Sequence, residues 1–338
     1  MRTGDIPALA QLNAAIFDSY VKAKSVLEKH DDAVVSVSGG ADSDVMVDII
    51  ARLDLDHKAR YIYFDTGLEY WATKDHLDYL EKEYEIKIER LKAKKPVPYC
   101  TKLYGQPFVS KFVSENCERM QRTGFKWEDK PYEVIRAEYD DMPIYTAKWW
   151  CNQFFMDRNA EASQSKFNIA RNKWLKEYII ANPPTFKISS KCCTYAKKAT
   201  AHEAQKDASL VIMGIRKAEG GVRSTAYKTC FDHKEGGQDT YRPIFWYTNA
   251  DKDAYKSLFC IRNSDCYEIW GMKRTGCVGC PYNRQLFAKD GEIDLIKQYE
   301  PRLYKACTTV FKDSYEYTKR YRDFCAEMEA QGKVPNER

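Results

Sequence analysis

Residues 34–46 constrain the fold more than any other stretch of the chain. An apolar, β-branched run from Val34 to Val37 leads into Ser38-Gly39-Gly40, and a helical pattern follows at once. Apolar side chains then recur at the spacing of one buried helix face, at Met46, Ile49, Ile50 and Leu53. The pattern predicts a strand, a tight turn and a helix.

The turn between this strand and helix has the composition of a phosphate-binding loop. Glycines let the backbone approach a ligand closely, and the start of a helix presents unpaired N–H groups to an anion. Ser38 and Ser43 add hydroxyl donors, while Asp42 would orient the loop or hold Mg²⁺, because it would repel a phosphate. No Gly-Lys-Ser/Thr follows, so this is not a Walker A loop. An ordinary strand-to-helix turn is the alternative.

The segment Ser-Gly-Gly-Ala-Asp-Ser at 38–43 resembles the SGGxDS signature of the PP-loop superfamily, which includes the N-type ATP pyrophosphatases and their PAPS-reductase relatives. The resemblance implies that Ser38, Gly39, Gly40, Asp42 and Ser43 bind ATP together with Mg²⁺. It also implies the fold of adenine nucleotide alpha hydrolases, a parallel sheet flanked by helices.

A second candidate loop, Asp65-Thr66-Gly67, follows the next apolar run at 60–64. Strands that alternate with helices indicate βαβ units and a parallel sheet, in which ligands bind at the carboxyl ends of strands. Both loops lie at such ends, so we expect Asp65, Thr66 and Gly67 in the same site. Asp65 would serve the ribose or the metal, and the alternative role is a cap of the turn.

A third candidate segment begins at the apolar run 210–215. Gly214 lies near its end, and Arg216 and Arg223 flank a Glu-Gly-Gly loop. Guanidinium groups suit phosphate or sulfate because they pair with two oxygens at once. We expect both arginines in the nucleotide site, against the alternative of solvated surface charges.

The chain is expected to form an α/β protein with a helical insertion and a helical C-terminal region. The predicted parts are a first part of the nucleotide-binding domain at 1–95, a mostly helical insertion at 96–184, a second part with the cysteines at 185–290, and a helical extension at 291–338. Further predicted elements are a helix over 8–30 and short strands at 86–88 and 186–188. The insertion would cover the site, meet a partner, or serve as a cap without a substrate role.

Composition narrows the class of protein. The 338 residues include 30% charged residues, carry a net charge of +5 and contain no apolar run of the about 18 residues that a membrane span needs. The first residues lack the apolar core of a signal peptide, so a cytoplasmic protein is expected. The charge is compatible with a phosphate-bearing ligand or a nucleic acid and demands neither.

Twelve cysteines are unusual for such a chain, and their spacing points to a metal rather than to disulfides. Cys277 and Cys280 form a Cys-x-x-Cys-Pro knuckle that aims two thiolates at one ion, and Cys192-Cys193 supply a second pair. Such a set holds Zn²⁺ or a [4Fe–4S] cluster, and adjacent cysteines favour the cluster because zinc sites typically space them by about two to four residues. Cys260 or Cys266 would be replacement ligands, and a redox dithiol is the remaining alternative.

The resemblance to the PAPS-reductase family extends beyond the first loop. Later segments match its landmarks in order. Residues 64–69 resemble the NTGxE stretch, with Asp in place of Asn, and residues 192–198 resemble the paired-cysteine segment of assimilatory APS reductases. Residues 213–216 together with Arg223 resemble the GxR…R substrate loop, and the segments 242–248 and 274–277 match the final landmarks. In APS reductases the two cysteine pairs bind [4Fe–4S], which implies Cys192, Cys193, Cys277 and Cys280 as ligands. The resemblance further implies catalytic roles for Asp42, Arg216 and Arg223.

The activity implied by this resemblance is that of a PP-loop ATP pyrophosphatase, which adenylates an acceptor, releases pyrophosphate and so prepares a sulfur transfer. Relatives act in sulfur modification of nucleic acid, including DNA phosphorothioation, alongside a cysteine desulfurase. The chain would then be a homo-oligomer or a subunit of such a complex.

Two alternatives stay open for the activity. The Glu-Cys-Gly-x-His tail of the reductases does not occur in the sequence, and the last cysteine, Cys325, lies in a helical pattern. The first alternative is therefore an APS or PAPS reductase that uses an external thiol. The second is a subunit that binds a nucleotide without turning it over.

Overall fold

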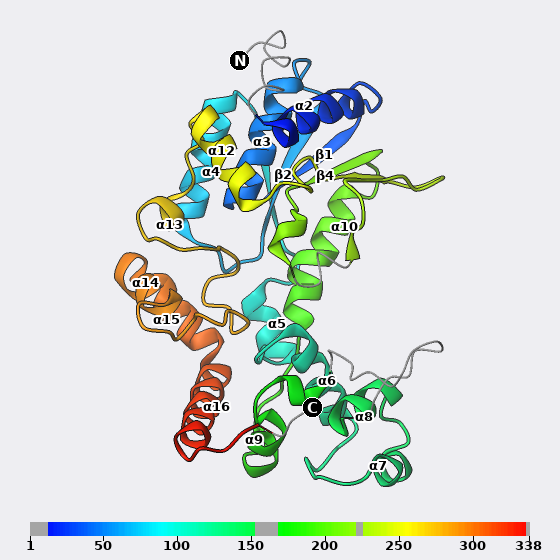
Figure 1. Cartoon of the computed structure of the whole chain (residues 1–338), viewed down its shortest axis with the longest axis vertical. Coiled ribbons are helices and arrows are strands. Elements are labelled where there is room, and N and C mark those ends of the chain that lie inside the picture. The colour runs from blue at the N-terminus through cyan, green and yellow to red at the C-terminus, as the bar shows by residue number, and fades with distance from the viewer. Residues whose placement is uncertain (1–12, 153–167, 221–225, 336–338) are drawn as a thin grey trace. The chain divides into compact units, whose positions relative to one another are not determined.

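The computed structural model describes residues 13–152, 168–220 and 226–335, and the chain divides into two compact units (Figure 1). Unit 1 comprises Met1–Pro96 and Ala196–Val278, and unit 2 comprises Val97–Tyr195 and Gly279–Arg338. Each unit buries a separate cluster of hydrophobic side chains, so each has a core of its own.

Unit 1 is built on one six-stranded sheet with the order β3-β2-β1-β4-β6-β5. The strands are β1 (Ala33–Val37), β2 (Ala59–Asp65), β3 (Ile88–Lys92), β4 (Leu210–Met213), β5 (Phe231–Asp232) and β6 (Asp239–Tyr241). All neighbouring strands pair in parallel except β5 and β6, which pair antiparallel. Parallel strands need crossover connections, and helices supply them between β1, β2 and β3. The predicted α/β fold class is confirmed.

Sequence signals account for several helix ends in unit 1. The Asn13 side chain caps the first helix by accepting hydrogen bonds from the Ala15 and Ile16 N–H groups, and Thr248 forms a capping box with Asp251. The helices and turns of this unit are α2 (Ala14–Leu27), α3 (Ala41–Leu53), α4 (Trp71–Tyr84), α10 (Thr200–Gln205), η4 (Lys217–Glu219), α12 (Asn249–Phe259) and α13 (Asp265–Glu268). A π-helix, η3 (Cys193–Ala199), contains the boundary between the two units.

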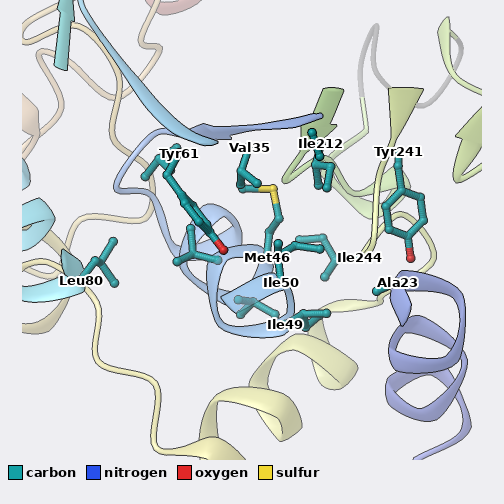
Figure 2. Packing of buried hydrophobic residues seen from close by; sticks show 14 of the residues in the cluster. Ala23, Val35, Met46, Ile49, Ile50, Tyr61, Leu80, Ile212, Tyr241 and Ile244 are labelled. Atoms are coloured by element: carbon teal, nitrogen blue, oxygen red, sulfur yellow. The ribbon is translucent and has the colours of Figure 1, made fainter. Parts of the chain in front are cut away.

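The main core of unit 1 lies between one face of the sheet and the helices α2, α3, α4 and α12. Figure 2 shows Met46 and Ile50 of α3 against Val35 and Ile212 of the two central strands. Successive strand residues point to opposite faces, so Val34 and Ile62 pack on the other face, with Ala204 of α10. Both faces of the central strands are therefore buried, as a parallel sheet requires.

One buried carboxylate ties three helices of this core together. Asp48 of α3 accepts hydrogen bonds from Arg52 Nε at 2.8 Å, from the Tyr84 hydroxyl of α4 at 2.9 Å and from the Tyr255 hydroxyl of α12. The Asp48 side chain is fully buried, so its charge is compensated by these donors rather than by water.

Unit 2 is helical. Its helices are α5 (Val97–Tyr104), α6 (Lys111–Arg122), α7 (Tyr132–Glu138), α8 (Ile144–Trp150), η2 (Ile169–Arg171), α9 (Leu175–Ala181), α14 (Glu292–Tyr299), α15 (Pro301–Val310) and α16 (Lys312–Ala330). Its core is rich in aromatic side chains, including Trp149, Trp150, Tyr178 and Tyr317. The helical insertion and the helical C-terminal region thus share one core.

Several predicted boundaries differ from the structure. The stretch 186–188 makes only an isolated bridge, between Gln106 and Ile188, and joins unit 2 because Ile188 is buried in that core. Residues 279–290 also belong to unit 2, where the Gly279 N–H donates to Glu292 of α14 and its carbonyl accepts from Tyr315 of α16. The strand expected at 86–88 begins only at Ile88.

The helix expected over 8–30 ends at Leu27, and residues 1–12 lie outside the described part of the chain. Within the described residues, no helix combines the length and the apolar character that crossing a membrane would require.

We predict that Asp48→Ala lowers the free energy of unfolding by about 3–5 kcal/mol, because it leaves Arg52 as a partly buried, unpaired charge. Tyr84→Phe removes one donor to the same carboxylate and should cost about 1 kcal/mol. The matched control is Asp78→Ala on α4, whose carboxylate is exposed and should contribute less than about 1 kcal/mol. Denaturant titration measures all three. Equal losses for Asp48→Ala and Asp78→Ala would contradict the structural role of Asp48.

Candidate functional site

The candidate phosphate loop connects β1 to α3 in a conformation that needs glycine. Gly39 has φ +61°, and a Cβ atom there would lie 2.7 Å from Thr73 Cγ2. The Ser38 N–H donates to the Ser43 hydroxyl at 2.9 Å, which fixes the turn. Gly40 precedes α3 and provides no side-chain cap, and in the first turn the Ala41 N–H donates to the Tyr267 hydroxyl. The loop has the anion-binding arrangement expected of a helix start.

The end of β4 packs directly on this loop. A Cβ atom at Gly214 would lie 3.1 Å from the Asp42 carbonyl oxygen, 3.1 Å from Ser43 Cα and 3.2 Å from the Ser43 nitrogen. These are main-chain atoms at the start of a helix, which cannot move aside as the end of a side chain could. Gly214 is therefore required for the approach of β4 to the loop.

Arg216 follows β4 and is ion-paired with the loop. Its Nε lies 2.9 Å from Asp42 Oδ1, and its Nη1 donates to Asn249 Oδ1 at 3.0 Å. The side chain is only 5% exposed, so a solvated surface role is wrong for this arginine. Asp42 therefore orients a buried cation at the start of α3, while its predicted roles in orienting the loop or holding Mg²⁺ stay predictions.

The second loop is held by its own carboxylates. Asp65 accepts from the Gly67 N–H at 2.8 Å and from Lys74 Nζ at 2.9 Å, so it caps the turn and pairs with α4. The hydroxyl of Thr66 donates to Glu69 and lies 3.4 Å from Cys277 Sγ. Burial raises the pKa of Glu69, and Lys197 opposes this shift.

Tyr267 of α13 and Thr275 of the segment after it lie at the phosphate loop that follows β1, and neither contact was predicted from the sequence. The Tyr267 hydroxyl lies 2.8 Å from Thr275 Oγ1, and both oxygens lie near the position of a Gly40 Cβ atom. Burial raises the pKa of Tyr267, and hydrogen bonds from Thr275 and from the Ala41 backbone oppose this shift. No spacing pattern links residues 267 and 275 to residue 40, so the sequence carries no signal for this contact.

A fully buried carboxylate in the first turn of α3 was also missed. Asp44 accepts from Asn263 Nδ2 at 2.7 Å and lies 3.0 Å from His76 Nε2. It anchors the start of α3 to α4 and to the chain before α13.

Unit 1 thus brings most of the predicted nucleotide-binding residues to the carboxyl ends of three neighbouring strands. Ser38, Gly39, Gly40, Asp42 and Ser43 follow β1, Asp65, Thr66 and Gly67 follow β2, and Gly214 and Arg216 follow β4. Arg223 lies outside the described residues.

Comparison with known proteins bears on this arrangement. Residues 32–125 match the family model described as the phosphoadenosine phosphosulfate reductase domain. This part of the chain is therefore similar to that domain.

Two solved structures are similar to the chain at low identity. The crystal structure of phosphoadenylyl-sulfate (PAPS) reductase from Candida auris, a phosphate complex, is 13% identical with a TM-score of 0.41, over 75% of this chain and 87% of that chain. The U34-tRNA thiolase NcsA from Methanococcus maripaludis, with its [4Fe-4S] cluster, is 12% identical with a TM-score of 0.35, over 93% of this chain and 80% of that chain. No curated protein matches the chain in sequence.

The predicted metal ligands are divided between the two units. Cys277 belongs to unit 1, with the strands of the sheet, whereas Cys192, Cys193 and Cys280 belong to unit 2. Among the residues that the structure describes, no three His, Cys, Asp or Glu side chains converge as metal ligands. The predicted ligand set therefore stays a prediction.

The charges of three of these thiols act on one buried phenol of unit 2. Burial raises the pKa of Tyr282, the Ser114 side chain opposes this shift, and the charges of Cys193, Cys192 and Cys280 raise it further. Cysteine thiolates are soft donors of the kind that an iron–sulfur cluster or zinc takes.

The two replacement ligands differ in their surroundings. Cys266 is fully buried in α13, while Cys260 is exposed at the end of α12, and its thiol donates to the Ser257 carbonyl at 3.9 Å. Cys325 lies in α16, as its helical pattern predicts, and its thiol donates to the Lys173 carbonyl at 3.6 Å.

We predict that Gly214→Ala lowers the free energy of unfolding of the protein by about 1–3 kcal/mol, because the added methyl group presses on the main chain at the start of α3. Gly276→Ala in the same unit is the matched control, since a Cβ atom there meets nothing within 4 Å. Denaturant unfolding followed by circular dichroism measures both variants. The close packing of β4 on the loop would be refuted by equal stability of the two.

We further predict that the protein purified without oxygen is brown and binds about four irons through Cys192, Cys193, Cys277 and Cys280. Serine at any of these positions should lower the iron content, whereas Cys260→Ser should not. Iron analysis and absorbance near 400 nm (about the range of thiolate-to-iron bands) measure this. Stoichiometric zinc without iron would exclude the cluster. A cluster that survives Cys193→Ala but is lost in Cys266→Ala would show that the predicted ligand set is wrong, although the protein binds a cluster.

Proposed function

We propose that this PAPS reductase-like chain is an ATP pyrophosphatase that adenylates an acceptor in preparation for sulfur transfer. The observation that carries the proposal is the packing of Gly214 on the loop at the start of α3, with Arg216 paired to Asp42. This contact puts an anion-binding helix start and a buried guanidinium within one small region of unit 1.

Each residue has a role in this chemistry that its position supports. The N–H groups of the first turn of α3 and the hydroxyls of Ser38 and Ser43 would bind the phosphates of ATP. Arg216, held by Asp42 and Asn249, would stabilise the negative charge that develops on the departing pyrophosphate. Arg223 would add a second positive charge.

The bonds exchanged in the reaction follow from the products. An acceptor oxygen attacks the α-phosphorus of ATP, a new P–O bond forms, and the bond to the bridging oxygen of the β-phosphate breaks. Pyrophosphate leaves with the electron pair of that bond, and the acceptor keeps the adenylyl group. Asp42 is the carboxylate of the loop that fits Mg²⁺, which would neutralise part of the phosphate charge when bound.

The cysteines suggest what the activated acceptor receives. Cys192, Cys193, Cys277 and Cys280 would hold a [4Fe–4S] cluster, which would supply the redox or sulfur-carrying chemistry of the transfer step. We also propose a cytoplasmic location and a cysteine desulfurase or a sulfur-modification complex as partner. A nucleic acid is the proposed acceptor, as in DNA phosphorothioation.

A reductase is the second candidate, and the position of Cys325 argues against this chain supplying the thiol. That cysteine lies within the 19-residue helix α16, and burial raises the pKa of its thiol, which lowers the fraction of reactive thiolate. Reduction of APS or PAPS would then require a thiol from another protein.

We predict that the anaerobically purified protein binds ATP and that Ser43→Ala weakens binding by about tenfold or more, because one charge-assisted hydrogen bond is lost. Gly276→Ala should bind like the wild type. Calorimetry measures the affinity, and chromatography of incubations with ATP and candidate acceptors identifies pyrophosphate and the adenylylated acceptor. Saturable binding without pyrophosphate or AMP would favour the non-catalytic subunit. Release of sulfite from APS or PAPS would favour the reductase, and Cys325→Ser would show whether Cys325 takes part.

A further inference from the structure

Unit 2 contains a pocket of about 470 Å³ whose walls all belong to that unit. Its walls come from the start of α6, from α8, from the segment around η2 and from α16. The volume falls within the range of roughly 300–1,000 Å³ that is typical of small-molecule sites. The pocket lies outside the PP-loop of unit 1 and has no role in the chemistry described above.

Three buried polar side chains line this pocket without hydrogen-bond partners among the described residues. They are Trp149, Asn168 and Thr318, which are 1%, 3% and 5% exposed. Within the same part of the chain, the Trp149 Nε1, both the Oδ1 and Nδ2 atoms of Asn168, and the Thr318 hydroxyl lack a partner. A buried polar group that nothing pairs with destabilises the fold, so a cluster of them at one cavity calls for a ligand.

Neighbouring side chains of the same types form hydrogen bonds within the fold. The indole N–H of Trp150, next to Trp149 in α8, donates to the Glu128 carbonyl at 2.9 Å. The Ser314 hydroxyl, one turn before Thr318 in α16, donates to the Pro107 carbonyl. Asn168 directly precedes η2 but makes no cap to it. Among the described residues of unit 2, four of the five buried side-chain atoms without a partner therefore lie at the pocket, the fifth being the Tyr282 hydroxyl.

Positive charge surrounds the same pocket. Arg171, Lys173, Arg284 and Arg322 line it, and no Asp or Glu of the described ranges does. Lys173 is paired with Glu329 at 2.6 Å, and Arg322 donates to the Arg284 carbonyl at 2.9 Å. Among the described residues, no acidic side chain forms an ion pair with the exposed Arg171 or Arg284. These two guanidinium groups are available to an anion such as phosphate.

Aromatic rings supply a third type of contact. Phe112 is 38% exposed and lies edge-on to Trp149, with ring centroids 6.2 Å apart, and Tyr321 lines the pocket on the side of α16. A partly exposed ring next to unpaired donors and acceptors suits a planar, polar ring.

We propose that this pocket binds a nucleoside phosphate: the phosphate pairs with Arg171 and Arg284, and the base or ribose pairs with Trp149, Asn168 and Thr318. The indole N–H only donates, whereas the amide and the hydroxyl both donate and accept. The ligand must therefore offer both kinds of polar group, as a nucleoside does. A free mononucleotide and the phosphorylated end of a single strand share this chemistry.

The test measures binding to the full chain with Gly40→Leu, whose bulkier side chain at the loop of unit 1 separates this site from the proposed ATP site. The probes are AMP, GMP, CMP and UMP, inorganic phosphate, and a 5′-phosphorylated oligothymidylate. We expect saturable binding of one nucleotide, weakened about tenfold or more by Arg171→Gln or Arg284→Gln. Arg302→Gln, at an exposed arginine of α15, is the control and should bind normally.

A second pair of variants separates ligand binding from a structural role. Asn168→Leu and Thr318→Val remove unpaired polar atoms at nearly constant size, so we expect them to weaken nucleotide binding and to raise the unfolding temperature by about 2–4 °C. If these residues merely stabilise the fold, their substitution would instead lower the unfolding temperature.

The outcomes decide the proposal. Binding of any nucleoside monophosphate more tightly than inorganic phosphate supports it and assigns a free nucleotide, and binding of the oligothymidylate alone supports it and assigns a strand end. Equal binding of inorganic phosphate and the nucleotides overturns it, as does no saturable binding. Loss of stability in Asn168→Leu, or an Arg171→Gln chain that binds like Arg302→Gln, also overturns it.

Discussion

The close contact between the end of β4 and the start of α3 determines the geometry of unit 1 around the candidate site. Gly214 lies against the main chain of Asp42 and Ser43, leaving no room for a side chain. Since β1 and β4 are paired neighbours, this contact fixes the loop after β1 relative to the residues after β4. The pairing of Arg216 with Asp42 follows directly from it.

The charged side chains around this contact are paired with partners in the fold rather than left to the solvent. Asp42 holds Arg216, Asp65 holds Lys74, and Asp44 is buried among the side chains of His76 and Asn263. A buried ion pair is costly to break but orients its members, and a cation oriented before a ligand arrives loses less entropy on binding. The Arg216 guanidinium is therefore oriented next to the start of α3 before a ligand arrives.

Unit 2 is organised differently, around an aromatic core with polar atoms left unpaired at one cavity. Its insertion and C-terminal helices share this core although more than 100 residues separate them, as the hydrogen bond from Tyr178 to the Tyr317 carbonyl illustrates. The same unit holds Cys192, Cys193 and Cys280, whereas the remaining predicted ligand, Cys277, belongs to unit 1. The boundary between the units thus falls inside the Cys277–Cys280 knuckle.

Local pattern alone determined the strand, turn and helix at 34–46, the α/β class and the helical C-terminal region, because these depend on neighbours within a few residues. It also placed Asp65 and Arg216 at strand ends. Only the tertiary structure decided that Asp42 pairs with Arg216, that Tyr267 and Thr275 reach Gly40, that 186–188 joins unit 2, and that Trp149, Asn168 and Thr318 line one pocket. Such contacts join residues far apart in the chain, and side-chain packing, which leaves no periodic trace in the sequence, selects them.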